Sequence, residues 1–314
     1  MTNAPLLTVL WVLPVLAAVV VATLPATART AAKYLGVAAA TATLAVAILL
    51  AARFDPAGER FQFVESHPWI RSFGVGYTLG VDGIALALVV LTAGLVPLLM
   101  VAGWSDTDAD ADAETAGPHR KGPHLYVALT LVVEGMVLLS LTALDIFLFY
   151  VLFEAMLIPM YFLIGMFGGP ARGRAALKFL LYNLVGGLVM LAAVVGLYVV
   201  TARSGAFSEN STAGTFDFRA ISAAIADGSF VIQPAVANAL FLGFLFAFAV
   251  KAPLWPLHRW LPDAAVQATP ATAVLMMAVV DKVGTFGMLR YCLPIFGDAA
   301  TYFRPLVITL AVVG

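Results

Sequence analysis

The chain has 314 residues, of which 62% are hydrophobic and 11% are charged. Soluble proteins carry roughly 25% charged residues, so this composition excludes a water-soluble globule and indicates an integral membrane protein in a lipid bilayer. Lys and Arg number 17 against 18 Asp and Glu, and the resulting net charge of −1 gives no general attraction for nucleic acid. The single cysteine, Cys292, excludes a disulfide framework and a cysteine-held metal cluster.

The apolar segments predict an all-α polytopic fold. A transmembrane helix needs about 20 mainly apolar residues. Eight segments meet this requirement: 6–24, 32–52, 81–103, 124–142, 146–168, 177–201, 235–257 and 270–296. A ninth begins near Phe303 and is still apolar at Gly314, so we expect a truncated ninth span and a chain that is a piece of a longer protein.

Two longer segments, 53–80 and 202–234, are expected to be connections between spans. Within the second, Asp217–Asp227 is predicted to form a short surface helix.

The basic residues of the short connections predict the orientation, because Lys and Arg are retained on the inner side of a membrane. With the N-terminus outside, six of them fall in short inside connections: Arg29, Lys33, Arg172, Arg174, Lys178 and Arg259. The short outside connections then hold only Arg290 and Arg304. The sequence therefore favours an N-terminus outside.

Ionisable residues inside the apolar segments are the strongest functional signal. Glu134 lies in the fourth span, Glu154 in the fifth, Lys251 in the seventh, and Asp281 with Lys282 in the eighth. Each such residue costs about 2.5–3.5 kcal/mol at a helix centre, and four of them together cost about 10 kcal/mol. We therefore expect these side chains to avoid lipid and to serve an ion pathway.

Proline placement gives a second signal at the same position. Pro253 and Pro256 follow Lys251, and proline removes a backbone donor and clashes with the preceding turn. The seventh span is predicted to break after Lys251, and Pro159 is predicted to loosen the fifth helix after Glu154. Broken helices at membrane depth are tolerated where they are buried or line a watery cavity, and they commonly mark ion sites.

A carboxylate and a lysine on neighbouring helices form a two-state electrostatic element, because each charge favours the other. A row of Glu134, Glu154, Lys251 and Lys282 would relay protons laterally through the middle of the membrane. The alternative is a scaffold in which static ion pairs hold helices together. The sequence contains no arrangement typical of a nucleophile, a metal site or a phosphate cradle.

Three segments carry a family resemblance. FEAMLIPMYFLIG within 143–169, KFLLYNLVGG at 178–187 and KAPLWPLHRWLPDA at 251–264 resemble the antiporter-like subunits of respiratory complex I. Within this family, the flank of the glutamate is most similar to the M-type subunit of bacterial NADH–quinone oxidoreductase, the counterpart of mitochondrial subunit 4. The resemblance covers roughly residues 70–314 well and the first two spans loosely.

The resemblance implies roles at matching positions. Glu154 matches a fifth-helix glutamate that the family pairs with the lysine of a broken seventh helix, here Lys251. Lys282 matches an eighth-helix lysine on the central hydrophilic axis, and Glu134 matches an auxiliary fourth-helix acid. His258, in the loop after the break, is expected to hold other groups in position and not to relay protons.

The sequence departs from the family pattern at three positions. Arg259 and Ala265 stand where LHTWLPDAH usually has threonine and the final histidine, which weakens any relay that needs a titrating group at the inside mouth. Asp281 stands where the residue before the lysine is usually apolar, so the charge state of Lys282 is expected to differ.

The resemblance also implies the organisation of the chain. Family members have about fourteen helices, with two inverted five-helix repeats after the first three. Residues 1–123 would form an N-terminal three-helix segment, 124–296 the first repeat with a proton half-channel, and 297–314 the start of a truncated second repeat.

The predicted function is that of a proton-translocating subunit of complex I in a bacterial cell membrane. It would be driven by NADH oxidation and quinone reduction in other subunits. Flavin, iron–sulfur clusters and quinone are expected in those partners, with no cofactor or metal in this chain. The alternative within the same family is a subunit of a multi-subunit Na⁺/H⁺ antiporter.

Overall fold

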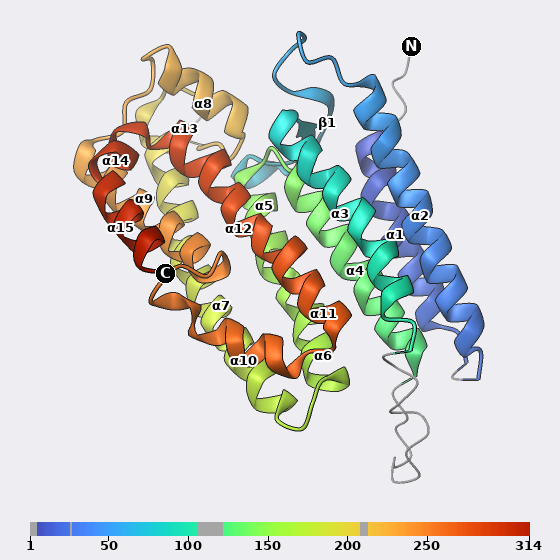
Figure 1. Cartoon of the computed structure of the whole chain (residues 1–314). Helices are drawn as coiled ribbons and strands as arrows, with labels where there is room; N and C mark the ends of the chain where they lie inside the picture. Colours follow the sequence, from blue (N-terminus) through green and yellow to red (C-terminus); the bar gives the residue numbers. More distant parts are fainter. Residues whose placement is uncertain (1–4, 26, 106–121, 208–212) are drawn as a thin grey trace.

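A computed structural model of the chain describes residues 5–25, 27–105, 122–207 and 213–314. Its long helices lie roughly side by side in one bundle (Figure 1). The helices are α1 Leu6–Ala22, α2 Arg29–Arg53, α3 Gly83–Ala102, α4 Pro123–Thr142, α5 Ile146–Ala155, α6 Leu157–Phe167, α7 Arg172–Ser204, α8 Phe218–Ala226, α9 Pro234–Lys251, α10 Trp260–Gln267, α11 Pro270–Leu275, α12 Asp281–Gly287, α13 Leu293–Ile295, α14 Gly297–Tyr302 and α15 Arg304–Val313. The strands are β1 Gln62–Ile70 and β2 Val75–Val81.

Seven helical segments in the described part of the chain are long and apolar enough to cross a membrane. They comprise α2, α3, α4, the pair α5–α6, α7, α9 and the segment from α11 to α13. The helices α1 and α15 are apolar but shorter. The predicted polytopic helical membrane fold is therefore confirmed at this level of detail.

The bundle has two sides (Figure 1). The helices α1 to α4 pack together on one side, where α1 contacts α4 and α2 contacts α3. On the other side α7 packs against α9 and α6, and α9 packs against α12. The helix α4 joins the two sides because it also contacts α5 and α6.

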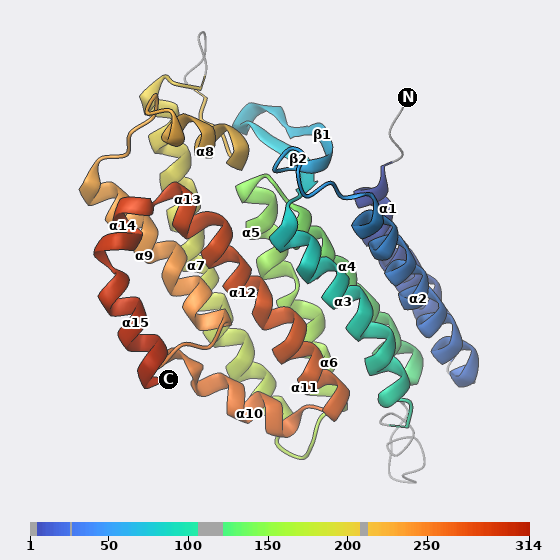
Figure 2. The same ribbon diagram turned by 45° about the horizontal axis from the view of Figure 1, so that its top comes forward.

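The segment 53–80 is more than a connection, so the all-α prediction is wrong there. The strands β1 and β2 form an antiparallel hairpin that turns through Gly74, whose φ of 63° favours glycine. Figure 2 shows the hairpin at the end of the bundle that also carries α8. The helix α8 is the short helix predicted within Asp217–Asp227.

The hairpin is joined to the start of α1 by hydrogen bonds. The carboxylate of Glu65 accepts from the backbone N–H of Leu7 and Thr8 and from the Thr8 hydroxyl. The Tyr77 hydroxyl lies 2.7 Å from Thr8 Oγ1 and accepts from Trp11 Nε1 at 2.9 Å. These contacts satisfy amides that a helix N-terminus leaves without partners.

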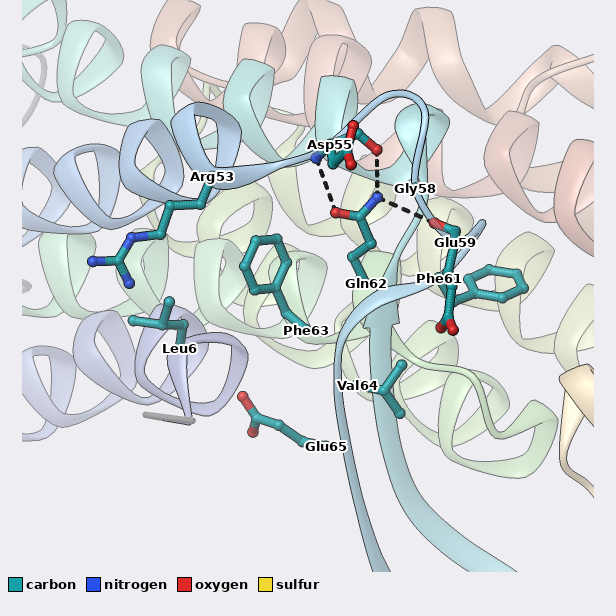
Figure 3. A pocket seen from close by; sticks show the side chains of 10 residues that line it. All are labelled: Leu6, Arg53, Asp55, Gly58, Glu59, Phe61, Gln62, Phe63, Val64 and Glu65. Atoms are coloured by element: carbon teal, nitrogen blue, oxygen red, sulfur yellow. Dashed lines mark hydrogen bonds between the residues drawn. The ribbon is translucent and has the colours of Figure 1, made fainter. Parts of the chain in front are cut away.

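A cavity of about 770 Å³ lies between the hairpin, the end of α2 and the start of α1. Figure 3 shows that its wall includes Arg53, Phe63 and Glu65. Gln62 closes the loop at one edge, because its side-chain amide donates to the Asp55 and Glu59 carbonyls and its oxygen accepts from Asp55 N–H.

Two of the membrane segments are interrupted. The predicted fifth span is broken at Met156 between α5 and α6. Pro159 accounts for this break, because it has no N–H to donate to the carbonyl of Ala155, four residues earlier. The predicted eighth span, from α11 to α13, contains two π-helical turns, Met276–Val280 before α12 and Met288–Cys292 after it. Such turns occur frequently at functional sites.

Candidate functional site

Lys251 lies at the centre of the candidate site. It is the last residue of α9 and is 1% exposed. Its ammonium donates to the backbone carbonyl of Phe153 and lies 3.5 Å from the centroid of the Phe153 ring. A carbonyl dipole and an aromatic face both stabilise a cation, so the structure holds the lysine head group at α5, one residue before Glu154.

The chain after Lys251 leaves the helix where the two prolines predict. Residues 252–256 are non-helical and lead through a short 3₁₀ turn, Leu257–Arg259, into α10. Pro253 has no N–H for the Ala249 carbonyl, which instead accepts from Leu254 N–H at 2.9 Å. The Val250 carbonyl accepts from the indole Nε1 of buried Trp260 at 2.9 Å. These bonds allow a broken helix to exist inside the bundle, because carbonyls away from water need partners.

Glu154 lies on α5 one residue after the carbonyl that holds Lys251. Both of its carboxylate oxygens are buried, and neither has a hydrogen-bond partner among the described residues. The carboxylate lies against Gly187 of α7, at the place that a Cβ atom on residue 187 would occupy. Lys251 interacts electrostatically with Glu154. The two predicted residues are therefore brought together.

The neighbouring charged residues Asp281 and Lys282 of the eighth predicted span lie on different faces. Asp281 is 5% exposed and interacts electrostatically with Lys251. Lys282 is exposed and lines a cavity of about 400 Å³ with residues of α3 that include Gly83 and Ala87. The structure therefore brings Asp281, and not Lys282, to the interior site. The sequence resemblance alone points to the lysine.

Two further predicted residues stand apart. Glu134, in the middle of α4, is 0% exposed, and its carboxylate oxygens have no hydrogen-bond partner in the described ranges. His258 lies in the 3₁₀ turn after the break and has a buried Nδ1 that finds no partner in the part of the chain with defined placement. The hydrogen bond and ring contact of the Lys251 ammonium are made with Phe153.

A buried ion pair was not anticipated. Arg290 Nη2 donates to Asp82 Oδ1 at 2.8 Å, and three rings surround its guanidinium: Phe61, Phe218 and Phe286. Arg290 was expected in a short outside connection, but the residue is 3% exposed in the second π-helical turn. The sequence did hold a signal for this burial. Arg290 lies inside the eighth apolar segment and not in a loop, so the rule that places basic residues in inside loops does not apply to it.

Residues 143–314 match the family model described as NADH:quinone oxidoreductase/Mrp antiporter, TM, which covers α5 to α15 and the whole Lys251 site. The chain belongs to this family. The assignment confirms the antiporter-like resemblance at the glutamate and broken-helix segments.

Similar proteins from this family include the NADH-quinone oxidoreductase subunits M of Mycobacterium tuberculosis and Rhodobacter capsulatus. They are 60% and 39% identical and align with 100% and 98% of this chain. The chain spans 59% and 57% of their lengths.

Solved structures agree with the fold. The respiratory complex I of Thermus thermophilus contains a chain that is 28% identical, with a TM-score of 0.78 over 98% of this chain and 57% of that one. The Mrp complex from Dietzia contains a chain at 22% identity with a TM-score of 0.69 over 92% of this chain and 28% of that one, which shows a shared fold alone.

Proposed function

We propose that the chain forms the proton-conducting first half of an M-type subunit of NADH:quinone oxidoreductase. The observation that carries the proposal is the buried Lys251 at a broken helix, held beside a Glu154 carboxylate that has no hydrogen-bond partner among the described residues. The similarity to subunit M sequences at 60% and 39% identity supports an M-type subunit over an Na⁺/H⁺ antiporter subunit of the same family.

The proposed mechanism uses the electrostatic link between Glu154 and Lys251. An ionised Glu154 stabilises the Lys251 ammonium, and proton uptake by the carboxylate removes that stabilisation, so the lysine releases its proton more readily. The Glu154 carboxylate oxygens suit this role, because a proton can reach them without breaking a hydrogen bond to any residue that the structure describes. Glu134 would act as an auxiliary acid, Lys282 would receive protons at the exposed face, and His258 would be positional.

The proposed topology has the N-terminus outside, with eight complete spans and a ninth in α15. In this arrangement α1 is the first span, although it has only 17 residues. Residues 1–123 form the N-terminal segment, 124–296 the first repeat and 297–314 the start of a second. The hairpin and α8 would then lie on the outer side of a bacterial cell membrane.

The proposed partners are other membrane subunits of the same complex. Redox chemistry would take place in subunits that hold flavin, iron–sulfur clusters and quinone, with this chain holding none of these cofactors. Energy would reach Glu154 and Lys251 through contacts between neighbouring antiporter-like subunits.

The test uses inverted membrane vesicles from cells that produce the full-length protein. NADH-driven acidification of the vesicle lumen is measured with a pH-sensitive dye and divided by the rate of NADH oxidation. We expect Glu154→Gln and Lys251→Ala to lower this ratio, because loss of a proton-transferring group slows proton transfer by roughly 100-fold or more. The surface variant Asp298→Asn on α14 serves as the matched control.

Assembly is checked by co-purification with flavin- and iron–sulfur-containing subunits. Intact assembly with an unchanged acidification ratio in both variants would leave a static scaffold as the better description. If the vesicles show no NADH-driven acidification but exchange protons on addition of Na⁺, the chain belongs to an Na⁺/H⁺ antiporter.

A further inference from the structure

Asp281 is a buried acid in the eighth segment that the proton relay described above does not use. We infer that Asp281 carries the proton between Lys251 in the interior and Lys282 at the exposed face. This inference rests on the proposed proton-conducting function and adds one proton-binding group to it.

The packing of α12 places Asp281 at the end of α9. Gly284 of α12 lies so close to this end that a Cβ atom at residue 284 would be 2.9 Å from Ala252 N and 3.1 Å from Phe248 O. Asp281 precedes Gly284 by three residues and therefore shares its helix face. The residue next to Ala252 is Lys251, so Asp281 lies on the face of α12 that packs against the end of α9, where it interacts electrostatically with Lys251.

The carboxylate of Asp281 is buried at high cost and is incompletely satisfied. The residue is 5% exposed, and its Oδ1 atom has no hydrogen-bond partner among the residues that the structure describes. Buried polar atoms are almost always hydrogen-bonded, and the exceptions call for a functional explanation. A residue that only filled space at this position would be apolar.

Asp281 is the group that both lysines share. It interacts electrostatically with Lys251 and with Lys282. Lys251 is 1% exposed, whereas Lys282 faces the cavity beside α3. The two ammonium groups therefore lie on different faces, and the carboxylate between them provides the connection.

The π-helical turn Met276–Val280 sets this arrangement. Such a turn accommodates one extra residue and rotates the helix after it by about 100° relative to an uninterrupted α-helix. Without the rotation, the inward position relative to α11 would fall to Val280, and Asp281 would point where Lys282 points now. The π turn directly precedes Asp281.

Each proton transfer in this relay has a donor and an acceptor. The Lys251 ammonium gives its proton to the Asp281 carboxylate, which leaves a neutral amine and a neutral carboxylic acid. Lys282 first passes its own proton to the next acceptor in the complete subunit and becomes a neutral amine. The acid then gives its proton to this amine, which restores the Asp281 carboxylate and forms the Lys282 ammonium. Lys251 is reprotonated from Glu154.

The charged groups around this site define its pH dependence. Lys251 on α9 interacts electrostatically with Asp281 and with Glu154 of α5, and Lys282 adjoins Asp281 on α12. Glu134 lies on α4, which also contacts α12. Removing the acid changes the charge that Lys251 meets, so a relay role affects the pH profile of transport and not its rate alone.

The experiment compares Asp281→Asn and Asp281→Glu with Asp298→Asn, an exposed acid on α14, in vesicles that contain the complete protein. We expect Asp281→Asn to assemble and to lower the acidification per NADH, because loss of a proton-transferring group slows proton transfer by roughly 100-fold or more. Asp281→Glu should retain transport with a displaced pH optimum, and Asp298→Asn should match the unmodified protein.

Unchanged acidification across the pH range in Asp281→Asn, while Glu154→Gln abolishes it, overturns this inference and leaves the proposed function intact. Unchanged acidification in both variants overturns the proposed function itself. If Asp281→Asn fails to assemble, Asp281→Glu decides: an unchanged pH optimum indicates a structural acid and contradicts the relay.

Discussion

The carboxylate of Glu154 on α5 occupies the space beside Gly187 on α7 that a side chain at residue 187 would fill. The glycine therefore fixes where the negative charge stands relative to Lys251, which binds the neighbouring carbonyl of Phe153. The segment 178–187 therefore contributes to the site through its last residue, Gly187, which leaves room for the Glu154 carboxylate.

Gly187→Ala should displace the carboxylate of Glu154 without unfolding the protein. The atoms that the new methyl group meets belong to the end of a flexible side chain, which can rotate away. We expect NADH-driven acidification to fall, because a misplacement of about 1 Å between reacting groups can cost roughly 100-fold in rate. Gly173→Ala on the same helix is the control, since a Cβ atom there meets nothing within 4 Å. Equal acidification in the two variants would contradict this role.

Trp260→Phe should destabilise the break after α9. The indole N–H donates to the Val250 carbonyl, and phenylalanine would leave this carbonyl buried without that donor. The expected loss in free energy of unfolding is about 1–3 kcal/mol. Thermal unfolding of the detergent-purified protein measures it, with Trp255→Phe as the control because Trp255 is 44% exposed. A loss of the same size in both variants would argue against the hydrogen bond.

Arg290→Met should be strongly destabilising, because it leaves Asp82 beside a buried apolar side chain. Breaking a buried ion pair by removing one partner costs about 3–5 kcal/mol. The double variant Asp82→Asn/Arg290→Met should recover part of this loss, since no uncompensated charge remains. Arg219→Met breaks the partly exposed pair with Asp217 and should cost about 0–1 kcal/mol in the same unfolding measurement.

Asp145 should make stability depend on pH. It caps α5 by accepting from Leu148 N–H and joins the hairpin by accepting from Gly76 N–H, each at 2.9 Å. Burial raises the pKa of Asp145 from 3.8 to about 6, so the folded protein binds the proton more tightly than the unfolded chain does. The stability that follows from this difference is full below pH 3.8 and is lost as pH rises through about 6.

Asp145→Asn should remove this part of the pH dependence. Unfolding midpoints between pH 4 and pH 7 provide the measurement, and Asp298→Asn controls for the loss of an exposed carboxylate. A slope that is the same in Asp145→Asn as in the unmodified protein would assign the dependence to other groups.

Local sequence predicted much of the fold and part of the site. Long apolar segments predict membrane helices because a bilayer satisfies no backbone hydrogen bonds. Pro253 and Pro256 predict the end of α9, because the missing N–H groups act within one turn. The hairpin was not predicted, although residues 62–81 are rich in β-branched and aromatic residues around Gly74, because strands of nine and seven residues do not stand out among apolar segments of membrane-span length.

The sequence by itself determined that this is a membrane bundle with a lysine at a broken helix and acids in neighbouring spans. Only the tertiary structure decided which of Asp281 and Lys282 faces the interior. Their order in the sequence is fixed, but the face that each presents depends on a π-helical turn, which hydrophobic periodicity does not reveal in a segment that is apolar on most sides. The pairing of Arg290 with Asp82, 208 residues apart, likewise required the packing of the eighth segment against α3.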